Sequence, residues 1–301
     1  ISIVVPVFNE ELCLHEFYIE VCKGLKRYRS WEVLFVDDGS TDSSWQKILE
    51  ISSKDERVRA IRFTRNFGHQ VAVLAGLAEV DSPFIAIIDA DLQDPPSLIP
   101  SMQRLVKDGV EMVYGRRVSR DGETWFKKFS AKVFYRIFQS LVPFDVPLDT
   151  GDFRVISQKV KNQVIAMNER DPFLRGLFAL TGYRSVAFDY VRSKRFSGET
   201  KYSLRKMMSL AVNAVLTFSD FPLRLFTRIS FLLLSVSTIF GCWAILNSFF
   251  GGAISGWLSI FVLVLFLGSL NTVFLAIMGS YLLQTLKASR FRPIYFVSER
   301  I

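Results

Sequence analysis

Short apolar runs alternate with segments of helical period over the first third of the chain. The apolar runs are too short for typical helices and predict buried strands at 1–10, 31–36, 58–63 and 84–88. Helical patterns lie between these runs at 12–25, 43–53 and 70–79. Strands that alternate with helices predict an α/β fold, in which a mostly parallel sheet is flanked by helices on both faces.

Polar residues gather where each predicted strand ends. These clusters occupy positions 8–10, 37–42, 65–70 and 89–94. Parallel strands bring their carboxyl ends to one edge of a sheet, and ligands of open α/β sheets bind at that edge. The sequence therefore predicts one binding site to which four strand ends contribute.

The last of these clusters begins with a carboxylate pair. Asp89 and Asp91 are two positions apart on an extended chain, so their side chains point to the same side. Mg²⁺ and Mn²⁺ prefer such oxygen ligands and leave coordination positions open for substrate phosphates. We expect Asp91, at a solvent-facing strand end, to hold such an ion with help from Asp89 and Gln93. Solvated turn aspartates are the alternative interpretation.

Two segments near the C-terminus contain no charged residue, at 229–250 and 257–283. Each exceeds the roughly 20 residues that cross a bilayer as a helix. With the short turn 251–256, they predict a two-helix transmembrane hairpin; a pair of buried core helices is the alternative. Basic residues flank both outer ends, which predicts a cytoplasmic location for the preceding domain and for the tail. They are Arg224, Arg228, Lys287, Arg290 and Arg292.

The net charge of +8 calls for an acidic partner. The sequence shows no recognisable nucleic-acid-binding module of aromatic and basic residues, so we do not expect nucleic acid as a partner. Basic residues instead interleave with aromatic and aliphatic residues near 121–142, and lie among mostly aliphatic residues near 203–218, which predicts amphipathic helices on an anionic membrane surface. Ordinary helices packed on the sheet are the alternative. The chain begins with a strand, so we expect no cleavable signal peptide, and its three cysteines show no metal-ligand spacing.

Several motifs carry a resemblance to a known family. Residues 6–10, 36–42 and 89–91 resemble the nucleotide-sugar motifs of the family 2 glycosyltransferases, whose fold is called GT-A. Residues 91–96 and 150–154 resemble the polyprenyl-phosphate glycosyltransferases, which include dolichol-phosphate mannose synthases and bactoprenol glucosyltransferases. The likeness extends over nearly the whole chain. The segment Arg65-Asn66-Phe67-Gly68-His69-Gln70 and the two predicted spans favour the bactoprenol type.

The resemblance implies roles for particular residues. Those expected to bind the nucleotide sugar are Pro6, Phe8, Glu10, Val36, Asp38, Asp89, Ala90 and Asp91. Those expected to bind the lipid phosphate are Arg117, after a strand at 112–115, with Lys128, Arg195 and Lys201. Asp152, together with Asp91, matches the family's catalytic carboxylates. From the residues alone, Asp38 is equally suited to capping the next helix, and Asp152 to a structural ion pair with Arg154.

The implied reaction is the inverting transfer of a hexose from a nucleoside diphosphate sugar to a polyprenyl phosphate. Glucose, UDP-glucose and undecaprenyl phosphate are expected by resemblance, with Mg²⁺ or Mn²⁺ as cofactor. Mannosyl or aminoarabinosyl transfer, a processive polysaccharide synthase and a non-catalytic membrane scaffold are the alternatives. No Arg-Trp pair, which such synthases usually carry, occurs in the chain, and all four candidate carboxylates are present.

The domain organisation follows from these segments. We expect a cytoplasmic catalytic domain at 1–220, a transmembrane hairpin at 221–286 and a cytoplasmic tail at 287–301, in an integral protein of the bacterial plasma membrane. The tail has strand character at 292–298, and a lone strand leaves its backbone unsatisfied. We therefore expect it to pair with a sheet edge, in its own subunit or a neighbour's, and to support a homo-oligomer.

Overall fold

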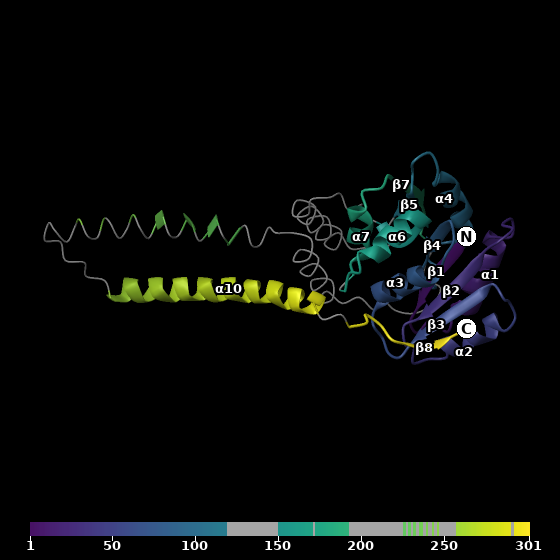
Figure 1. Cartoon of the computed structure of the whole chain (residues 1–301), viewed down its shortest axis with the longest axis horizontal. Helices are drawn as coiled ribbons and strands as arrows, with labels where there is room; N and C mark the ends of the chain where they lie inside the picture. Colours follow the sequence, from purple (N-terminus) through teal and green to yellow (C-terminus); the bar gives the residue numbers. More distant parts are fainter. Residues whose placement is uncertain are drawn as a thin grey trace. The chain divides into compact units, whose positions relative to one another are not determined.

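A computed structural model describes residues 1–118, 150–170, 172–192, 257–289 and 292–301, with isolated positions between 225 and 246. Two compact units make up the chain: one holds a sheet and includes Arg292–Ile301, and the other holds the long helix α10 (Trp257–Ser289) (Figure 1).

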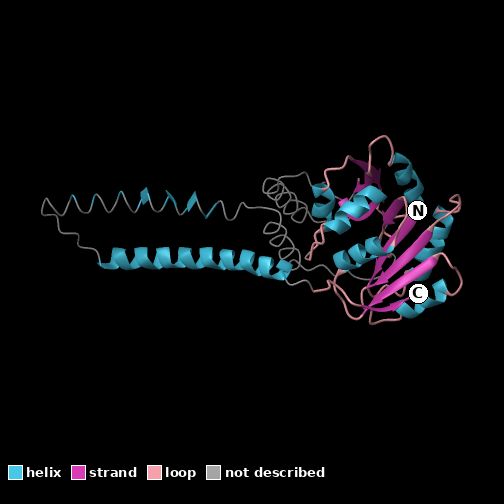
Figure 2. Cartoon of the chain, in the orientation of Figure 1, coloured by secondary structure: helices cyan, strands magenta, loops and turns pink. Residues whose placement is uncertain are grey.

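The first unit is built on an eight-stranded sheet of order β7-β5-β6-β4-β1-β2-β3-β8 (Figure 2). Strands β1 to β4 are parallel to their neighbours among themselves, whereas β6 is antiparallel to both β4 and β5, and β8 is antiparallel to β3. The strands are β1 (Ser2–Val7), β2 (Glu32–Asp37), β3 (Val58–Phe63), β4 (Phe84–Ile87), β5 (Met112–Arg117), β6 (Thr150–Ser157), β7 (Ser185–Tyr190) and β8 (Val297–Arg300).

Helices cover both faces of this sheet, as the strand–helix alternation predicted. One face carries Ile3, Val5 and Val7 of β1, and these belong to a core cluster with residues of the helices α1 and α2. On the other face, Gly76 of α3 lies so close to Val4 that an added Cβ would overlap its side chain. The helices are α1 (Leu14–Gly24), α2 (Ser44–Ser52), α3 (His69–Glu79), η1 (Pro96–Leu98), α4 (Ile99–Leu105), α6 (Gln158–Ala166) and α7 (Leu174–Leu180).

Burial on both faces explains the sequence pattern of the central strands. All six residues of β1 and five of the six in β2 are buried. A strand that is covered on both faces reads as a continuous apolar run rather than as an alternation. The expected strands and helices agree with the observed ones to within a few residues. One detail differs: Arg117 is the last residue of β5 rather than a residue that follows a strand ending at 115.

The C-terminal strand β8 closes one edge of the sheet. It pairs antiparallel with β3 of its own chain, and the backbones of Ala60 and Ile301 exchange two hydrogen bonds of 3.0 and 2.9 Å. Just before β8, the Tyr295 ring stacks on Phe63 with the ring centroids 4.9 Å apart. The predicted pairing of the tail with a sheet edge is therefore confirmed, with the strand at 297–300 instead of 292–298. The homo-oligomer stays a prediction.

Helix α10 covers the second predicted span. Within it, Phe266–Leu283 has a mean hydropathy of 1.6 and no buried residue. By length and composition, α10 is the one helix in the described residues that could cross a membrane. The first predicted span, at 229–250, is described only at isolated helical positions, so the hairpin stays a prediction. The expected interface helices at 121–142 and 203–218 lie outside the described residues.

Candidate active site

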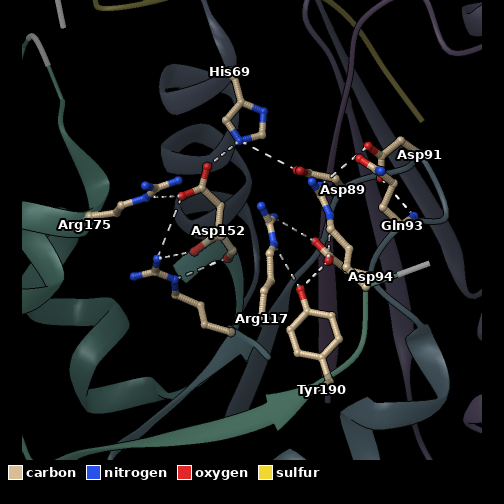
Figure 3. Close-up of polar contacts among 12 residues, drawn as sticks. His69, Asp89, Asp91, Gln93, Asp94, Arg117, Asp152, Arg175 and Tyr190 are labelled. Carbon is tan, nitrogen blue, oxygen red and sulfur yellow. Dashed lines mark hydrogen bonds and ion pairs between the residues drawn. The ribbon is translucent and has the colours of Figure 1, made fainter. Parts of the chain in front are cut away.

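The chemically active side chains lie together at the end of the sheet where the parallel strands have their carboxyl ends. Because β6 runs antiparallel between β4 and β5, its amino end lies beside the carboxyl ends of β4 and β5. This arrangement brings Asp152, near the start of β6, to the same place as Asp89, just after β4 (Figure 3). His69, the first residue of α3, lies between these two carboxylates. Three segments far apart in the sequence therefore form one site.

The carboxylate pair lies in the turn after β4. The Asp89 side chain is 30% exposed, whereas that of Asp91 is only 6% exposed and accepts a hydrogen bond of 3.1 Å from the Gln93 amide. Leu92, which directly follows Asp91, has a φ of 59°, in the left-handed region. The expectation of a solvent-facing Asp91 was wrong, because its side chain is buried, with Arg192 Nη2 3.9 Å from Asp91 Oδ2.

The electrostatics of this turn favour a cation. Burial raises the pKa of Asp89 to about 6, and the neighbouring carboxylates of Asp152, Asp91 and Asp94 add to this rise, although His69 opposes it. The charged form of a buried carboxylate such as Asp89, with other carboxylates nearby, is stabilised by a bound positive ion. Among the described residues there is no group of three or more His, Cys, Asp or Glu side chains arranged to hold a metal. Two carboxylates with open positions fit Mg²⁺ or Mn²⁺ bound jointly by protein and substrate phosphates.

Asp152 is held by three cationic side chains. Its Oδ2 lies 3.1 Å from His69 Nε2, and its Oδ1 lies 3.3 Å from Arg175 Nε and 3.8 Å from Arg154 Nη2. Gln70 Nε2 donates a further hydrogen bond of 3.4 Å to Oδ2. Burial alone would raise the pKa of Asp152, but Arg175, His69 and Arg154 hold it well below its usual range. Asp152 is therefore ionised at neutral pH and is a weak proton acceptor.

His69 carries the complementary charge. Burial lowers its pKa, but the carboxylates of Asp89 and Asp152 outweigh that effect and raise the pKa to about 9. At neutral pH, His69 is an imidazolium that bridges the two carboxylates, 3.7 Å from Asp89 Oδ1. Arg154, in contrast, has a structural role: it donates to the backbone carbonyls of Asp152 and Gly151 at 3.2 Å, and its guanidinium lies 4.3 Å over the Phe178 ring.

A second cluster surrounds Asp94, which is fully buried. The Tyr190 hydroxyl donates a hydrogen bond to Asp94 Oδ1. Arg192 Nε lies 3.4 Å from Oδ1, and Arg117 Nη2 lies 3.8 Å from Oδ2. Arg117 also donates to the Tyr190 hydroxyl at 3.5 Å, so the predicted phosphate ligand Arg117 is held beside the carboxylate turn (Figure 3).

The ends of β1 and β2 form the remaining part of the edge. Asp38 accepts hydrogen bonds from the amides of Phe67 at 2.6 Å and Gly68 at 2.9 Å, and it is 2% exposed. It therefore orders the loop that leads into His69, and no side-chain cap from Asp38 is seen on α2. Burial raises the pKa of Asp38, and these two amides oppose the rise.

The other expected nucleotide-sugar residues fall into two groups. Pro6 and Val36 are buried register partners in β1 and β2, and Ala90 is also buried, at 2% exposure. Phe8 and Glu10 are half-buried just beyond β1, where the Glu10 amide donates to Ser44 Oγ at 2.9 Å. Lys128, Arg195 and Lys201 lie outside the described residues.

Several site residues received no role from the sequence. His69 and Gln70 belong to a quoted motif, but their partner Asp152 is about 80 residues away, so no local pattern signals the contact. Asp94 lies in the segment 91–96 that carried the resemblance, and this was the available signal. Arg175, Tyr190 and Arg192 had none, because α7, which holds Arg175, and β7, which ends at Tyr190, reach the site only in the folded chain.

Comparison with known proteins agrees with this geometry. Residues 2–164 match the family model described as glycosyl transferase family 2. The chain belongs to this family. It is therefore a glycosyltransferase, and the resemblance drawn from its motifs is confirmed.

This family 2 glycosyltransferase has relatives that match it along almost their whole length. A glycosyltransferase of Bacillus subtilis described as uncharacterized is 40% identical over 300 residues, which cover 99% of this chain and 93% of the relative. A prophage bactoprenol glucosyl transferase homolog of Escherichia coli is 35% identical over 300 residues, with 99% and 98% covered. A bactoprenol glucosyl transferase of Shigella phage SfV is 33% identical over 300 residues, with 99% and 97% covered.

A solved structure supports the fold. The mannosyltransferase of Pyrobaculum calidifontis, in complex with GDP-Man and Mn²⁺, has a TM-score of 0.50 to this chain at 16% identity. The match covers 72% of this chain and 62% of that one. At this identity, the likeness concerns the GT-A-like architecture alone.

Proposed function

We propose that this glycosyltransferase transfers glucose from UDP-glucose to a polyprenyl phosphate, of the undecaprenyl type, at the cytoplasmic face of the bacterial plasma membrane. The observation that carries the proposal is the site at the carboxyl ends of the parallel strands: His69 joins Asp89 of the carboxylate pair to the ionised Asp152, and Arg117 lies 3.8 Å from Asp94 in the same turn as the pair. Relatives named bactoprenol glucosyl transferase, or a homolog of it, are matched along almost their whole length and support the choice of sugar and acceptor.

The donor end of the site would lie over the carboxylate turn. Asp89, Asp91 and Gln93 would hold Mg²⁺ or Mn²⁺, which when bound supplies positive charge for the leaving diphosphate. Asp38 keeps the neighbouring loop in place through its two backbone hydrogen bonds. The nucleoside would lie along the ends of β1 and β2, against Phe8, Glu10 and the backbone of Pro6, Val36 and Ala90.

The acceptor needs positioning more than activation. The second pKa of a phosphomonoester is about 6, so at neutral pH the lipid phosphate is largely a dianion and already nucleophilic. Asp152, with its pKa held low by Arg175 and His69, is suited to orienting groups rather than to accepting a proton. Arg117 would bind the phosphate, and Lys128, Arg195 and Lys201 are proposed as further ligands.

The reaction would then be a single displacement. A phosphate oxygen of the acceptor forms a bond to the anomeric carbon as the bond to the UDP diphosphate breaks, and UDP leaves. One displacement inverts the anomeric configuration, so an α-linked donor yields a β-linked lipid phosphosugar. Asp152 has no free proton-accepting role in this step, and the site gives Asp152 three cationic neighbours that keep it fixed.

The membrane would supply the lipid. The exposed apolar helix α10 supports membrane attachment of the second unit. We propose the domain plan predicted from the sequence: a cytoplasmic catalytic domain at 1–220 with interface helices, a transmembrane hairpin at 221–286 and a cytoplasmic tail. A homo-oligomer at the membrane is part of the same proposal.

A donor screen tests this function. Detergent-purified protein is incubated with polyprenyl phosphate, Mg²⁺ and a panel of nucleoside diphosphate sugars, and the lipid product is weighed by mass spectrometry. We expect one hexose per lipid phosphate, formed best from UDP-glucose. A mannosyl or aminoarabinosyl product would correct the sugar, a polymer would indicate a processive synthase, and no product with any donor would favour a scaffold.

A further inference from the structure

Arg192 has an unusual environment in the Asp94 cluster. It lies two residues after the end of β7. Its side chain is 25% exposed, but its Nε atom is buried. Nε lies 3.4 Å from Asp94 Oδ1 without the geometry of a hydrogen bond, and Nη2 lies 3.9 Å from Asp91 Oδ2. The guanidinium therefore reaches both the proposed metal ligand and the buried Asp94.

The hydrogen-bonding of this cluster is incomplete. Among the described residues, three buried side-chain atoms have no hydrogen-bond partner, and two of them are Arg192 Nε and Asp94 Oδ2. A buried donor that is left without an acceptor costs free energy, so such an atom in a folded protein calls for an explanation. A guanidinium donor is best satisfied by a negatively charged oxygen, such as that of a carboxylate or a phosphate.

The charges point the same way. Arg117 and Arg192 both form ion pairs with the single carboxylate of Asp94, and Arg192 forms a second ion pair with Asp91. A divalent cation on Asp91 would repel the guanidinium and take over its carboxylate. Two arginines would then share one buried carboxylate, which leaves one positive charge without a counter-ion. Guanidinium groups bind phosphate oxygens through paired N–H donors.

We propose that Arg192 is a phosphate ligand of the active site that rests on Asp91 and Asp94 until a divalent cation takes Asp91. A cation held by Asp91 would supply positive charge in the donor site, and the Arg192 guanidinium would then be free to bind a phosphate group. The phosphate belongs either to the diphosphate of the donor or to the lipid monophosphate. This inference rests on the proposed function for its ligand, but its metal step does not depend on sugar transfer.

The first test measures the metal alone. Binding of Mn²⁺ to the full-length protein without nucleotide is followed by electron paramagnetic resonance. Arg192→Gln should tighten Mn²⁺ binding on the order of fivefold, equivalent to about 1 kcal/mol, because a competing cation is removed from Asp91. Arg116→Gln is the matched control, since Arg116 is 51% exposed, pairs with Asp189 at 2.6 Å and removes the same charge. Equal Mn²⁺ affinity in both variants would overturn the proposal.

The second test identifies the phosphate. With Mn²⁺ saturating, calorimetry compares the binding of UDP and of farnesyl phosphate, a short polyprenyl monophosphate. Arg192→Gln should weaken one of them about tenfold relative to Arg116→Gln: loss of UDP binding assigns the donor diphosphate, and loss of farnesyl phosphate binding assigns the acceptor. If neither is weakened, Arg192 is not a phosphate ligand.

A second variant separates the effect of the Arg192 charge from the effect of its planar guanidinium, and so keeps the proposal testable if Arg192→Gln misfolds. Arg192→Lys keeps the charge but loses the planar fork, so Mn²⁺ binding should stay near the wild-type value while phosphate binding still weakens. Wild-type phosphate binding in Arg192→Lys would contradict the proposal. If the wild-type protein transfers no sugar but the Mn²⁺ result is as expected, the proposed function is wrong. The inference that a cation on Asp91 displaces Arg192 is then still supported.

Discussion

A single added methyl group tests whether the position of Arg117 matters for the acceptor. Gly151, the second residue of β6, lies directly against the Arg117 guanidinium. A Cβ on residue 151 would overlap Arg117 Nη2 and would lie 3.2 Å from Cζ and 3.6 Å from Nε. Gly151→Ala should therefore displace the guanidinium from its present position beside Asp94 and Tyr190 without removing its charge.

The size of the effect follows from these distances. Favourable contact between non-bonded heavy atoms begins at about 3.5 Å, so Nη2 must move by about 1 Å. The moving group is the far end of a flexible side chain, and we expect the free energy of unfolding to fall by less than about 1 kcal/mol. A misplacement of about 1 Å in a substrate-positioning group can cost about 100-fold in rate. We expect a loss of 10- to 100-fold in kcat/KM for polyprenyl phosphate.

Two comparisons make the assay specific. Affinity for UDP, measured by calorimetry with Mn²⁺, should stay within about twofold of wild type, because the three heavy atoms nearest to the added Cβ all belong to Arg117. In an Arg117→Ala background, Gly151→Ala should cause no further loss, since the clashing side chain is gone. An undiminished kcat/KM in Gly151→Ala, or a loss that persists without Arg117, would refute the reasoning.

Three further predictions concern other parts of the first unit. Gly76→Ala should lower the free energy of unfolding by about 1–3 kcal/mol in urea without changing UDP affinity, because the methyl overlaps Val4 in the core. In the presence of a chelator, wild type should be more stable than His69→Gln at pH 6.5 and should lose this advantage as the pH rises through 9. The pKa of His69 is about 9 in the folded state and about 6.5 in the unfolded state, so its protonation stabilises the fold fully only below pH 6.5. An advantage that grows with pH would contradict this. Truncation after Ser289 removes β8 and the Tyr295 stacking on Phe63, so unfolding should shift to lower urea concentration; unchanged stability, oligomer size and activity would make the tail passive.

The sequence predicted the sheet because each central strand is buried on both faces and reads as an apolar run. It predicted Asp89 and Asp91 because the two-residue period of an extended chain decides which side chains point together. It could not predict that Asp91 is buried, since Asp91 lies beside Arg192, which is distant in the sequence. Asp152 came from resemblance alone, as its place beside β4 depends on antiparallel pairing with β6.

The contacts between segments that are far apart in the chain were the main feature that the sequence did not predict. The approach of His69 to Asp152 requires α3 to begin opposite the start of β6, and no periodicity encodes that arrangement. The Asp94 cluster likewise joins a turn after β4 to the ends of β5 and β7. The tail strand was predicted to pair with an edge because an unpaired strand is unstable in isolation, but the choice of β3 depends on the three-dimensional path of the chain.

Direct analysis of the lipid product tests the central claim. Purified protein is given polyprenyl phosphate, Mg²⁺ and UDP-glucose labelled with ¹³C at the anomeric carbon, and the lipid fraction is examined by NMR. We predict a β-linked glucosyl phosphate from the wild-type protein and none from Asp91→Asn. A labelled lipid of α configuration, equal product from Asp91→Asn, or label released only as free glucose would contradict the account.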